Sequence, residues 1–331
     1  SMHELLALGS VPEPNGNFNM TTLALKGSRF HNGVSRIHGE VASVMERAVW
    51  PQIPPEENPI THVTNGVHMK TFLASEWYNL FDMRFDEWHD ELLNEDYWER
   101  IEQIPDYQFW SVRKQLKEWL LQELHHRVVQ QYRRNGESEA TIARVTHLIG
   151  KPDADTLVMG FARRFATYKR ATLLFSDPAR LARLLNDPER PTVIVFAGKA
   201  HPSDAPGQHL IKVIHEFSQR PEFQGRIIVL EGYDIRLARQ LVSGVDLWLN
   251  TPEYPLEASG TSGQKAAING VVNLSVLDGW WGEGFNGRNG WGIVPREPRL
   301  DIEQRNRDEA KDLLDLIEHE VLPLYFSRNG H

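Results

Sequence analysis

Two short segments of this 331-residue chain combine side chains that could hold phosphate groups. The first, residues 160–170, reads GFARRFATYKR, so an apolar run leads straight into Arg163, Arg164, Lys169 and Arg170. Arginine can grip phosphate through two hydrogen bonds, and lysine binds it as a point charge. A bent loop would let Arg164 and Lys169 converge on one oxyanion. The alternative is a solvated basic helix start, where the helix dipole would oppose the cations unless an anion offset them.

The second segment, residues 257–270, reads EASGTSGQKAAING. Its small and hydroxyl residues predict a helix that ends at Gly270, with backbone amides and the hydroxyls of Thr261 and Ser262 available to a phosphate. Lys265 would lie about one turn inside this helix. Its Ala, Ile and Gly neighbours would partly desolvate it, which lowers the pKa of the amine and favours a Schiff base. The alternative is an ordinary helix cap followed by a snorkelling lysine.

Together the two segments predict a site for two neighbouring phosphoryl groups and an aldehyde. The second segment is not a nucleotide-binding P-loop, because its glycine spacing is wrong and no Lys-Ser or Lys-Thr pair closes it.

The elements that must position these segments are predicted after residue 150, where apolar runs alternate with helical patterns. Strands are expected at 156–161, 192–196, 227–230, 245–249 and 271–277, and helices at 180–185, 208–217 and 235–242. Continuous apolar strands that alternate with helices indicate a parallel sheet covered on both faces. The prediction is an α/β, doubly wound, Rossmann-like fold, with ligands at the carboxyl ends of its strands.

The earlier part of the chain reads differently. Residues 3–63 are rich in turn formers and contain one expected helix at about 33–50, which Pro51, Pro54 and Pro55 would stop. Residues 64–150 read as mainly helical, with a long helix expected at 109–134.

Composition narrows the function classes. With 36 Lys and Arg against 45 Asp and Glu, the net charge of −9 argues against a nucleic-acid partner. The absence of cysteine excludes disulfides, thiolate nucleophiles and Cys-ligated zinc. No metal site is expected, since adjacent His125 and His126 would diverge on a helix. The apolar runs are too short for a membrane span and the start does not read as a signal peptide, so a cytoplasmic location without a membrane partner is expected.

Seven motifs, in order, resemble those of the glycogen, starch and maltodextrin phosphorylases, especially their shorter bacterial and archaeal branch. The motifs are NGVSRIH at 32–38, TNGVH at 64–68, RRFATYKR at 163–170, GK at 198–199, LEGY at 230–233, EASGTSGQK at 257–265 and DG at 278–279. Each is weak alone, but their collinearity is specific, and the match runs from about residue 5 to the end of the chain.

The resemblance implies a glycosyltransferase B-type, two-lobed enzyme. Residues 3–63 would then be the tail of the amino-terminal lobe, 64–150 the helical lead-in of the carboxyl-terminal lobe, and 151–331 a Rossmann-like cofactor domain truncated at its end. The implied reaction is phosphorolysis of an α-1,4-glucan by inorganic phosphate to glucose 1-phosphate, with retained anomeric configuration. The cofactor phosphate would relay a proton, and a phosphate dianion would stabilise an oxocarbenium-like state.

By similarity, Lys265 would carry pyridoxal 5'-phosphate. Thr261, Ser262 and Arg163 would hold the phosphate of this cofactor, and Tyr233 would lie near its ring. Arg164 and Lys169 would bind the substrate phosphate. The residues implied to hydrogen-bond the glucosyl unit are Asn65, Tyr168, Glu257, Ser259 and Gly260.

The chain also departs from the family pattern. Arg163 stands where many relatives have lysine, Ser262 replaces a common glycine, and Phe72 occupies a place often held by tryptophan. The family's amino-terminal glycine-rich loop and sugar-contacting histidine are not found, which implies a fragment that is inactive alone. The resemblance also implies a possible homodimer for the full-length protein.

Three other classes of protein are alternatives for this sequence. A non-catalytic glucan- or partner-binding fragment of the same fold remains the alternative. A nucleotide-sugar glycosyltransferase would have no use for Lys265, and a dinucleotide oxidoreductase would need a Gly-x-Gly-x-x-Gly motif after an early strand, which is missing.

Overall fold

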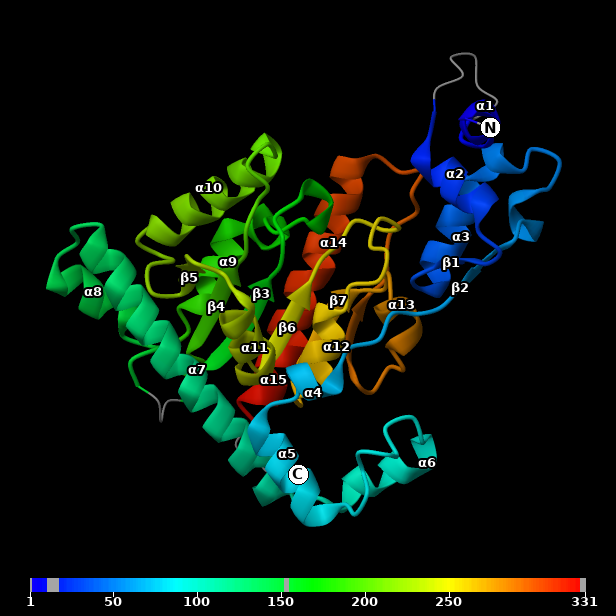
Figure 1. Ribbon diagram of the computed structural model, residues 1–331. Coiled ribbons are helices and arrows are strands. Elements are labelled where there is room, and N and C mark those ends of the chain that lie inside the picture. Colours follow the sequence, from blue (N-terminus) through cyan, green and yellow to red (C-terminus); the bar gives the residue numbers. More distant parts are fainter. Residues whose placement is uncertain (1, 11–17, 152–154, 328–331) are drawn as a thin grey trace.

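The computed structural model describes residues 2–10, 18–151 and 155–327. Its centre is a six-stranded sheet in the order β5-β4-β3-β6-β7-β8, and every neighbouring pair is parallel (Figure 1). The strands are β3 Leu157–Ala162, β4 Thr192–Ala197, β5 Ile227–Leu230, β6 Leu247–Asn250, β7 Val272–Val276 and β8 Gly290–Ile293. Because the strand order reverses between β3 and β6, the sheet is doubly wound, which confirms the predicted Rossmann-like class.

The five predicted strands are all present, each within two residues of the expected bounds. Strand β8 was not predicted. Its sequence, Gly290-Trp291-Gly292-Ile293, contains two glycines and shows no apolar alternation, yet it pairs with β7 over four residues, including Val276 with Ile293. Tertiary pairing with a buried neighbour therefore overrides a weak local preference.

Alternate side chains of the central strands supply two separate cores. Met159 and Phe161 of β3 point into one apolar cluster, and Val158 of the same strand points into the other, together with Val195 of β4. Every residue of β3 and β4 is buried, because both faces of the sheet are covered. This explains why these strands read as continuous apolar runs rather than as alternating ones.

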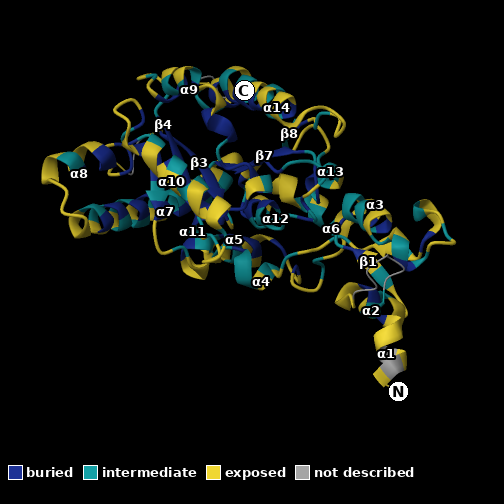
Figure 2. Ribbon diagram, turned by 90° about the horizontal axis from the view of Figure 1, so that it is seen from above, coloured by how far each residue is buried: buried dark blue, intermediate teal, exposed yellow. Residues whose placement is uncertain are grey.

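Helices cover both faces, and the buried strands lie between the two helical layers (Figure 2). On one side are α9 Pro178–Leu185, α10 Ala205–Gln219 and α14 Ile302–Leu316. On the other are α7 Asp106–Arg134, α8 Glu139–Thr146, α11 Ile235–Gly244 and α12 Ser262–Ala267. None of the helices in the described ranges is long and apolar enough to cross a membrane.

The long predicted helix is confirmed as α7, which has 29 residues and begins after Pro105. Leu120, Leu124 and Val128 lie on its buried stripe against the sheet. The predicted helix at 33–50 is shorter than expected. It begins at Arg36, after Ser35 accepts a hydrogen bond from the amide of His38, and it ends at Met45.

The remaining described elements are short. They are α1 Met2–Leu8, α2 Met20–Gly27, β1 His31–Gly33, α3 Arg36–Met45, η1 Arg47–Val49, η2 Pro55–Glu57, β2 Ile60–His62, α4 Met69–Phe72, α5 Ser75–Arg84, α6 Glu95–Trp98, η3 Glu99–Gln103, η4 Thr167–Lys169, η5 Leu173–Ser176, α13 Trp281–Gly284, η6 Ile317–Val321 and α15 Leu322–Tyr325. Strands β1 and β2 form a separate parallel pair. The division of the chain at residues 63 and 150 stays a prediction.

Candidate active site

The first predicted segment is a bent loop. Strand β3 ends at Ala162, and the chain then makes one 3-10 turn, η4, before Arg170 adopts a left-handed conformation at φ 46°. The helix start considered from the sequence is therefore wrong, and the bent-loop alternative holds. Because β6 flanks β3 on the side where the strand order reverses, the loops that follow these two strands lie at the switch point where such folds bind ligands.

Two of the loop cations share one carboxylate oxygen. Oε2 of Glu257 accepts hydrogen bonds from NH2 of Arg163 at 2.7 Å and from Nζ of Lys169 at 2.5 Å. Arg163 also donates to Oδ1 of Asn250, at the end of β6. The three charged side chains are each at most one-tenth exposed. This buried cluster carries one negative charge against two positive ones. Because buried charges are costly unless they are paired, the excess positive charge favours binding of an anion.

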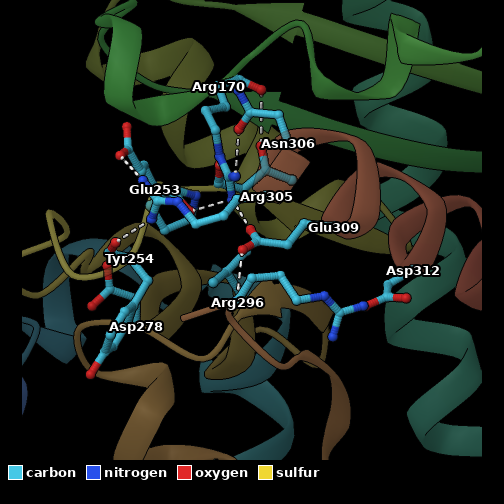
Figure 3. Close-up of polar contacts among 12 residues, drawn as sticks. Arg170, Glu253, Tyr254, Asp278, Arg296, Arg305, Asn306, Glu309 and Asp312 are labelled. Atoms are coloured by element: carbon cyan, nitrogen blue, oxygen red, sulfur yellow. Dashed lines mark hydrogen bonds and ion pairs between the residues drawn. The ribbon is translucent and has the colours of Figure 1, made fainter. Parts of the chain in front are cut away.

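The other two cations behave differently. Arg164 is exposed, and its side chain makes no hydrogen bond or ion pair with another residue of the described ranges. Arg170 turns away from the cluster toward α14, where NH2 pairs with Glu309 at 2.5 Å and NH1 donates to Asn306 at 2.9 Å (Figure 3). It also donates to the carbonyl of Pro252. Arg170 thus anchors the loop to α14.

Tyr168 completes the first segment. Its half-buried ring lies under the ammonium of Lys169, with 4.5 Å between Nζ and the ring centroid. Its carbonyl accepts the amide of Glu253 at 2.7 Å, which joins the loop after β3 to the loop after β6. The structure therefore brings Arg163, Lys169 and Tyr168 together with Glu257. The predicted convergence of Arg164 with Lys169 is not seen, because Arg163 takes that place and Arg164 is exposed.

The loop at residues 257–260 is fixed by a buried turn beside it. Both carboxylate oxygens of Asp278 accept backbone amides, from Glu257 at 2.9 Å and from Gly279 at 2.8 Å. Burial raises the pKa of Asp278 to about 6. Gly279 has φ 53°, and a Cβ there would lie 2.3 Å from the carbonyl oxygen of Ser259, so only glycine allows this close approach.

Two other residues of this loop, Ser259 and Gly260, were predicted to hydrogen-bond the glucosyl unit, and those roles stay predictions. Ser259 is buried, and its hydroxyl has no hydrogen-bond partner among the described residues. Gly260 has φ 82°, and a Cβ there would lie 3.2 Å from Oε1 of Glu257. The amino-terminal part of the chain also reaches this loop, because Oγ of Ser35 donates to the carbonyl of Ala258 at 2.7 Å.

Lys265 lies on α12, four residues after Thr261, as the sequence predicted. Its Nζ lies 4.3 Å from the centroid of the Phe72 ring, and burial lowers the pKa of the amine. Thr261 occupies the N-cap position without a side-chain cap bond, and its carbonyl accepts the amide of Lys265. The expected helix is shorter than predicted, ending at Ala267 rather than at Gly270.

Fully buried Asn269 fixes the position of Lys265 against Phe72. Its Nδ2 donates to the carbonyls of both residues at 2.8 Å, and its Oδ1 accepts the amide of Ala74 at 2.8 Å. The carbonyl of Asn269 accepts from NH1 of Arg113, on α7, at 3.0 Å. The helical segment before the sheet is thus locked onto the helix that carries the lysine.

A cavity of about 380 Å³ opens beside Lys265, within the roughly 300–1,000 Å³ that small-molecule sites occupy. Its lining residues are Phe72, Ala162, Lys199, Tyr233, Asp234, Ile235, Ala238, Val242, Trp248, Ser262 and Lys265. The positive charge of Arg163 acts on the phenol of Tyr233, opposing the burial that raises the pKa of this group. Arg163 therefore contributes positive electrostatic potential at the Tyr233 side of the cavity.

Asn65 does not enter this cavity through its side chain in the described structure. It is exposed, and its contact with α12 is a hydrogen bond from Nε2 of Gln264 to its backbone carbonyl at 2.7 Å. No group of three or more His, Cys, Asp or Glu side chains that could hold a metal ion occurs in the described ranges.

Comparison with known proteins identifies the family. The family model described as carbohydrate phosphorylase matches residues 4–281. The chain belongs to the carbohydrate phosphorylase family. It is 43% identical to the maltodextrin phosphorylase of Thermococcus litoralis over 99% of this chain and 38% of the relative. It is 42% identical to the glycogen phosphorylase of Aquifex aeolicus over 98% of this chain and 46% of the relative.

A third relative, the glycogen phosphorylase of Mycobacterium bovis, is 40% identical over 98% of this chain and 37% of its own length. The chain thus spans between 37% and 46% of the length of these phosphorylases. The resemblance stated from the motifs is confirmed.

Several residues of this candidate site could not be found from local patterns. Asn269 and Trp248 were not singled out. Asp278 and Lys199 appeared only as parts of family motifs, and Phe72 only as a departure from them. A polar residue directly at the end of an apolar helix or strand is the sequence pattern that could have found Asn269 and Asp278.

Proposed function

We propose that the chain carries the pyridoxal-phosphate site of an α-1,4-glucan phosphorylase. The observation that carries this proposal is the partly buried amine of Lys265, whose pKa is lowered by burial, beside a cavity that Lys199 also lines. A lysine in this state is suited to condense with an aldehyde at neutral pH. The residues present fit the cofactor, since the cavity offers an amine, an aromatic phenol at Tyr233 and a hydroxyl at Ser262.

In this proposal Lys265 holds the cofactor, and Arg163, Thr261 and Ser262 bind its phosphate beside Tyr233. When bound, the cofactor supplies a phosphate group that can exchange a proton with a neighbouring phosphate.

Arg164 and Lys169 attract and orient inorganic phosphate as the second anion. Lys169 must then release part of its bond to Glu257, which leaves that carboxylate free to accept from a sugar hydroxyl. The side chains that would orient the glucosyl unit are those of Asn65, Tyr168, Glu257 and Ser259, with the backbone of Gly260.

The proposed reaction is phosphorolysis of an α-1,4-glucan to glucose 1-phosphate with retention of configuration. It is proposed for a protein of the relatives' length, since the chain corresponds to 37–46% of that length. For the chain alone we propose cofactor binding. The names of the relatives, which include maltodextrin and glycogen phosphorylases, support a glucan substrate.

The test is to incubate the chain with pyridoxal phosphate, record the absorbance of the bound cofactor, reduce with borohydride and locate the label by peptide mass. We expect the label on Lys265 and its loss in Lys265→Ala. Lys199→Ala is the matched control, because Lys199 lines the same cavity and should leave the label in place. Labelling at exposed lysines only, unchanged in Lys265→Ala, would overturn the proposal. Phosphate-dependent release of glucose 1-phosphate by the longer protein tests the activity.

A further inference from the structure

The hydroxyl of Ser262 has an unusual environment. Ser262 lines the same cavity as Lys265, and Oγ lies 3.2 Å from the indole Nε1 of Trp248. Trp248 is 1% exposed, belongs to β6 and lines the same cavity. This contact joins two residues that are 14 positions apart.

The direction of this hydrogen bond is fixed by chemistry. An indole N–H can only donate, so Ser262 Oγ must accept with one lone pair. The hydroxyl then keeps its own hydrogen for a second partner. Among the residues that the structure describes, no group accepts that hydrogen.

Other serines of the fold show the contrast. Ser243 donates its hydroxyl hydrogen to the carbonyl of Arg239 in its own helix at 2.9 Å. Ser275 accepts from Nδ2 of Asn250, as Ser262 accepts from Trp248, but its own hydrogen goes to the carbonyl of Val276 at 2.9 Å. Serine commonly bonds nearby backbone carbonyls in this way. At Ser262 no carbonyl of the described residues takes the hydrogen, which points away from Trp248 and is available to a ligand of the cavity.

A phosphate oxygen is the acceptor that suits this hydrogen, because an ionised phosphate accepts hydrogen bonds, Lys199 lines the cavity, and the positive charge of Arg163 acts on Tyr233 in the cavity lining. We propose that Trp248 is a positioning residue that holds the Ser262 hydroxyl as a donor to the phosphate of the bound cofactor. The inference rests on the proposed function. It adds that the site should bind pyridoxal phosphate in preference to pyridoxal, which lacks the phosphate.

The test compares pyridoxal phosphate with pyridoxal, which lacks the phosphate, by absorbance titration of the chain. Trp248→Phe removes the N–H and keeps an aromatic ring. We expect it to weaken pyridoxal phosphate binding about three- to tenfold, the net worth of one typical hydrogen bond, and to leave pyridoxal binding unchanged. Ser262→Ala should give the same selective loss, and the double variant no more than either single one.

Trp281→Phe is the matched control, since Trp281 is equally buried and donates from Nε1 to the carbonyl of Trp291, outside the cavity lining. It should leave both affinities unchanged.

Equal weakening of both compounds by Trp248→Phe, or additive losses in the double variant, would overturn the inference while the proposed function stands. Failure of the unmodified chain to bind either compound at Lys265 would instead overturn the proposed function and, with it, this inference. If Trp248→Phe does not fold, Ser262→Ala decides alone. A loss of affinity confined to pyridoxal phosphate supports the donor role of Ser262, whereas an unchanged affinity for pyridoxal phosphate overturns it.

Discussion

The ammonium of Lys169 is joined to the carboxylate of Glu257 by a 2.5 Å hydrogen bond across the switch point of the sheet. The same oxygen accepts from Arg163 at 2.7 Å. One buried carboxylate therefore neutralises part of the charge that the sequence predicted for phosphate groups. In the proposed function an incoming phosphate would compete with Glu257 for these two cations.

Glu257→Gln should expose this competition. Without phosphate the variant should be less stable than the parent, because two buried cations lose their charged partner. Added phosphate should stabilise the variant more than the parent, because its affinity for inorganic phosphate should rise about fivefold, or about 1 kcal/mol. Thermal midpoints measured against phosphate concentration at constant ionic strength test this, with Glu253→Gln, which removes the pair with Arg305, as the control. An equal or smaller response to phosphate would show that Glu257 does not compete.

Asp278 predicts a pH dependence of stability. Its folded pKa of about 6 lies above its ordinary value of 3.8, so folding favours the protonated form. The folded state binds the extra proton between these values, and the free energy of unfolding should therefore fall as pH rises from about 4 to about 6, by up to about 3 kcal/mol. Above that window the contribution levels off. Asp278→Asn should remove this slope, measured as the difference between the two proteins in denaturant unfolding from pH 4 to pH 7. If the unfolding free energies of the parent and of Asp278→Asn changed with pH in parallel, the raised pKa of Asp278 would be refuted.

Phe72 covers the amine of Lys265 and is expected to control its reactivity. Its ring covers the amine at 4.3 Å, and burial lowers the pKa of this group. Phe72→Ala should admit water, raise the pKa of Lys265 and slow its reaction with pyridoxal phosphate near pH 7. The rate of the absorbance change, followed against pH, should shift its midpoint upward. A downward shift would mean that loss of the cation–π contact outweighs the gain of water. Phe30→Ala, which removes an exposed ring beside Arg29, should have no effect.

Glu309 stabilises the cationic loop from α14. Its carboxylate is buried and pairs with buried Arg170 at 2.5 Å, and its other oxygen accepts the amide of Arg296 (Figure 3). Glu309→Ala leaves a buried guanidinium without its charge partner, which should cost about 3–5 kcal/mol of unfolding free energy. Chemical denaturation measures the loss. Glu139→Ala, which breaks an exposed pair with Arg133, should change stability little, and similar losses in both variants would contradict the prediction.

The sheet could be predicted from sequence because its strands are apolar on both faces and its helices separate them. Strand β8 could not, since its glycines give no local signal. The two chemical segments were also predictable, because they combine unusual residue types within a few positions. Arg170, however, belongs to the cationic run in sequence but pairs with Glu309, 139 residues away. Local spacing cannot show which member of such a run turns toward another element.

The partners of Lys265 illustrate the same limit. Asn269 holds the lysine helix to the carbonyl of Phe72 across 197 positions, and nothing in the sequence near either residue indicates that bond. Trp248 read as one more apolar strand residue, and its indole N–H acquires meaning only when Ser262 is placed beside it. Such relationships follow from the assembled fold, whereas the residue types alone indicated the chemistry.

The reversal of strand order between β3 and β6 has a consequence for assembly of the chain. Arg163 and Lys169 follow β3, which pairs with β4 and then β5, whereas Glu257 follows β6, which pairs with β7 and then β8. A chain in which only the first half of the sheet has formed therefore presents two cations whose counter-ion has not yet arrived.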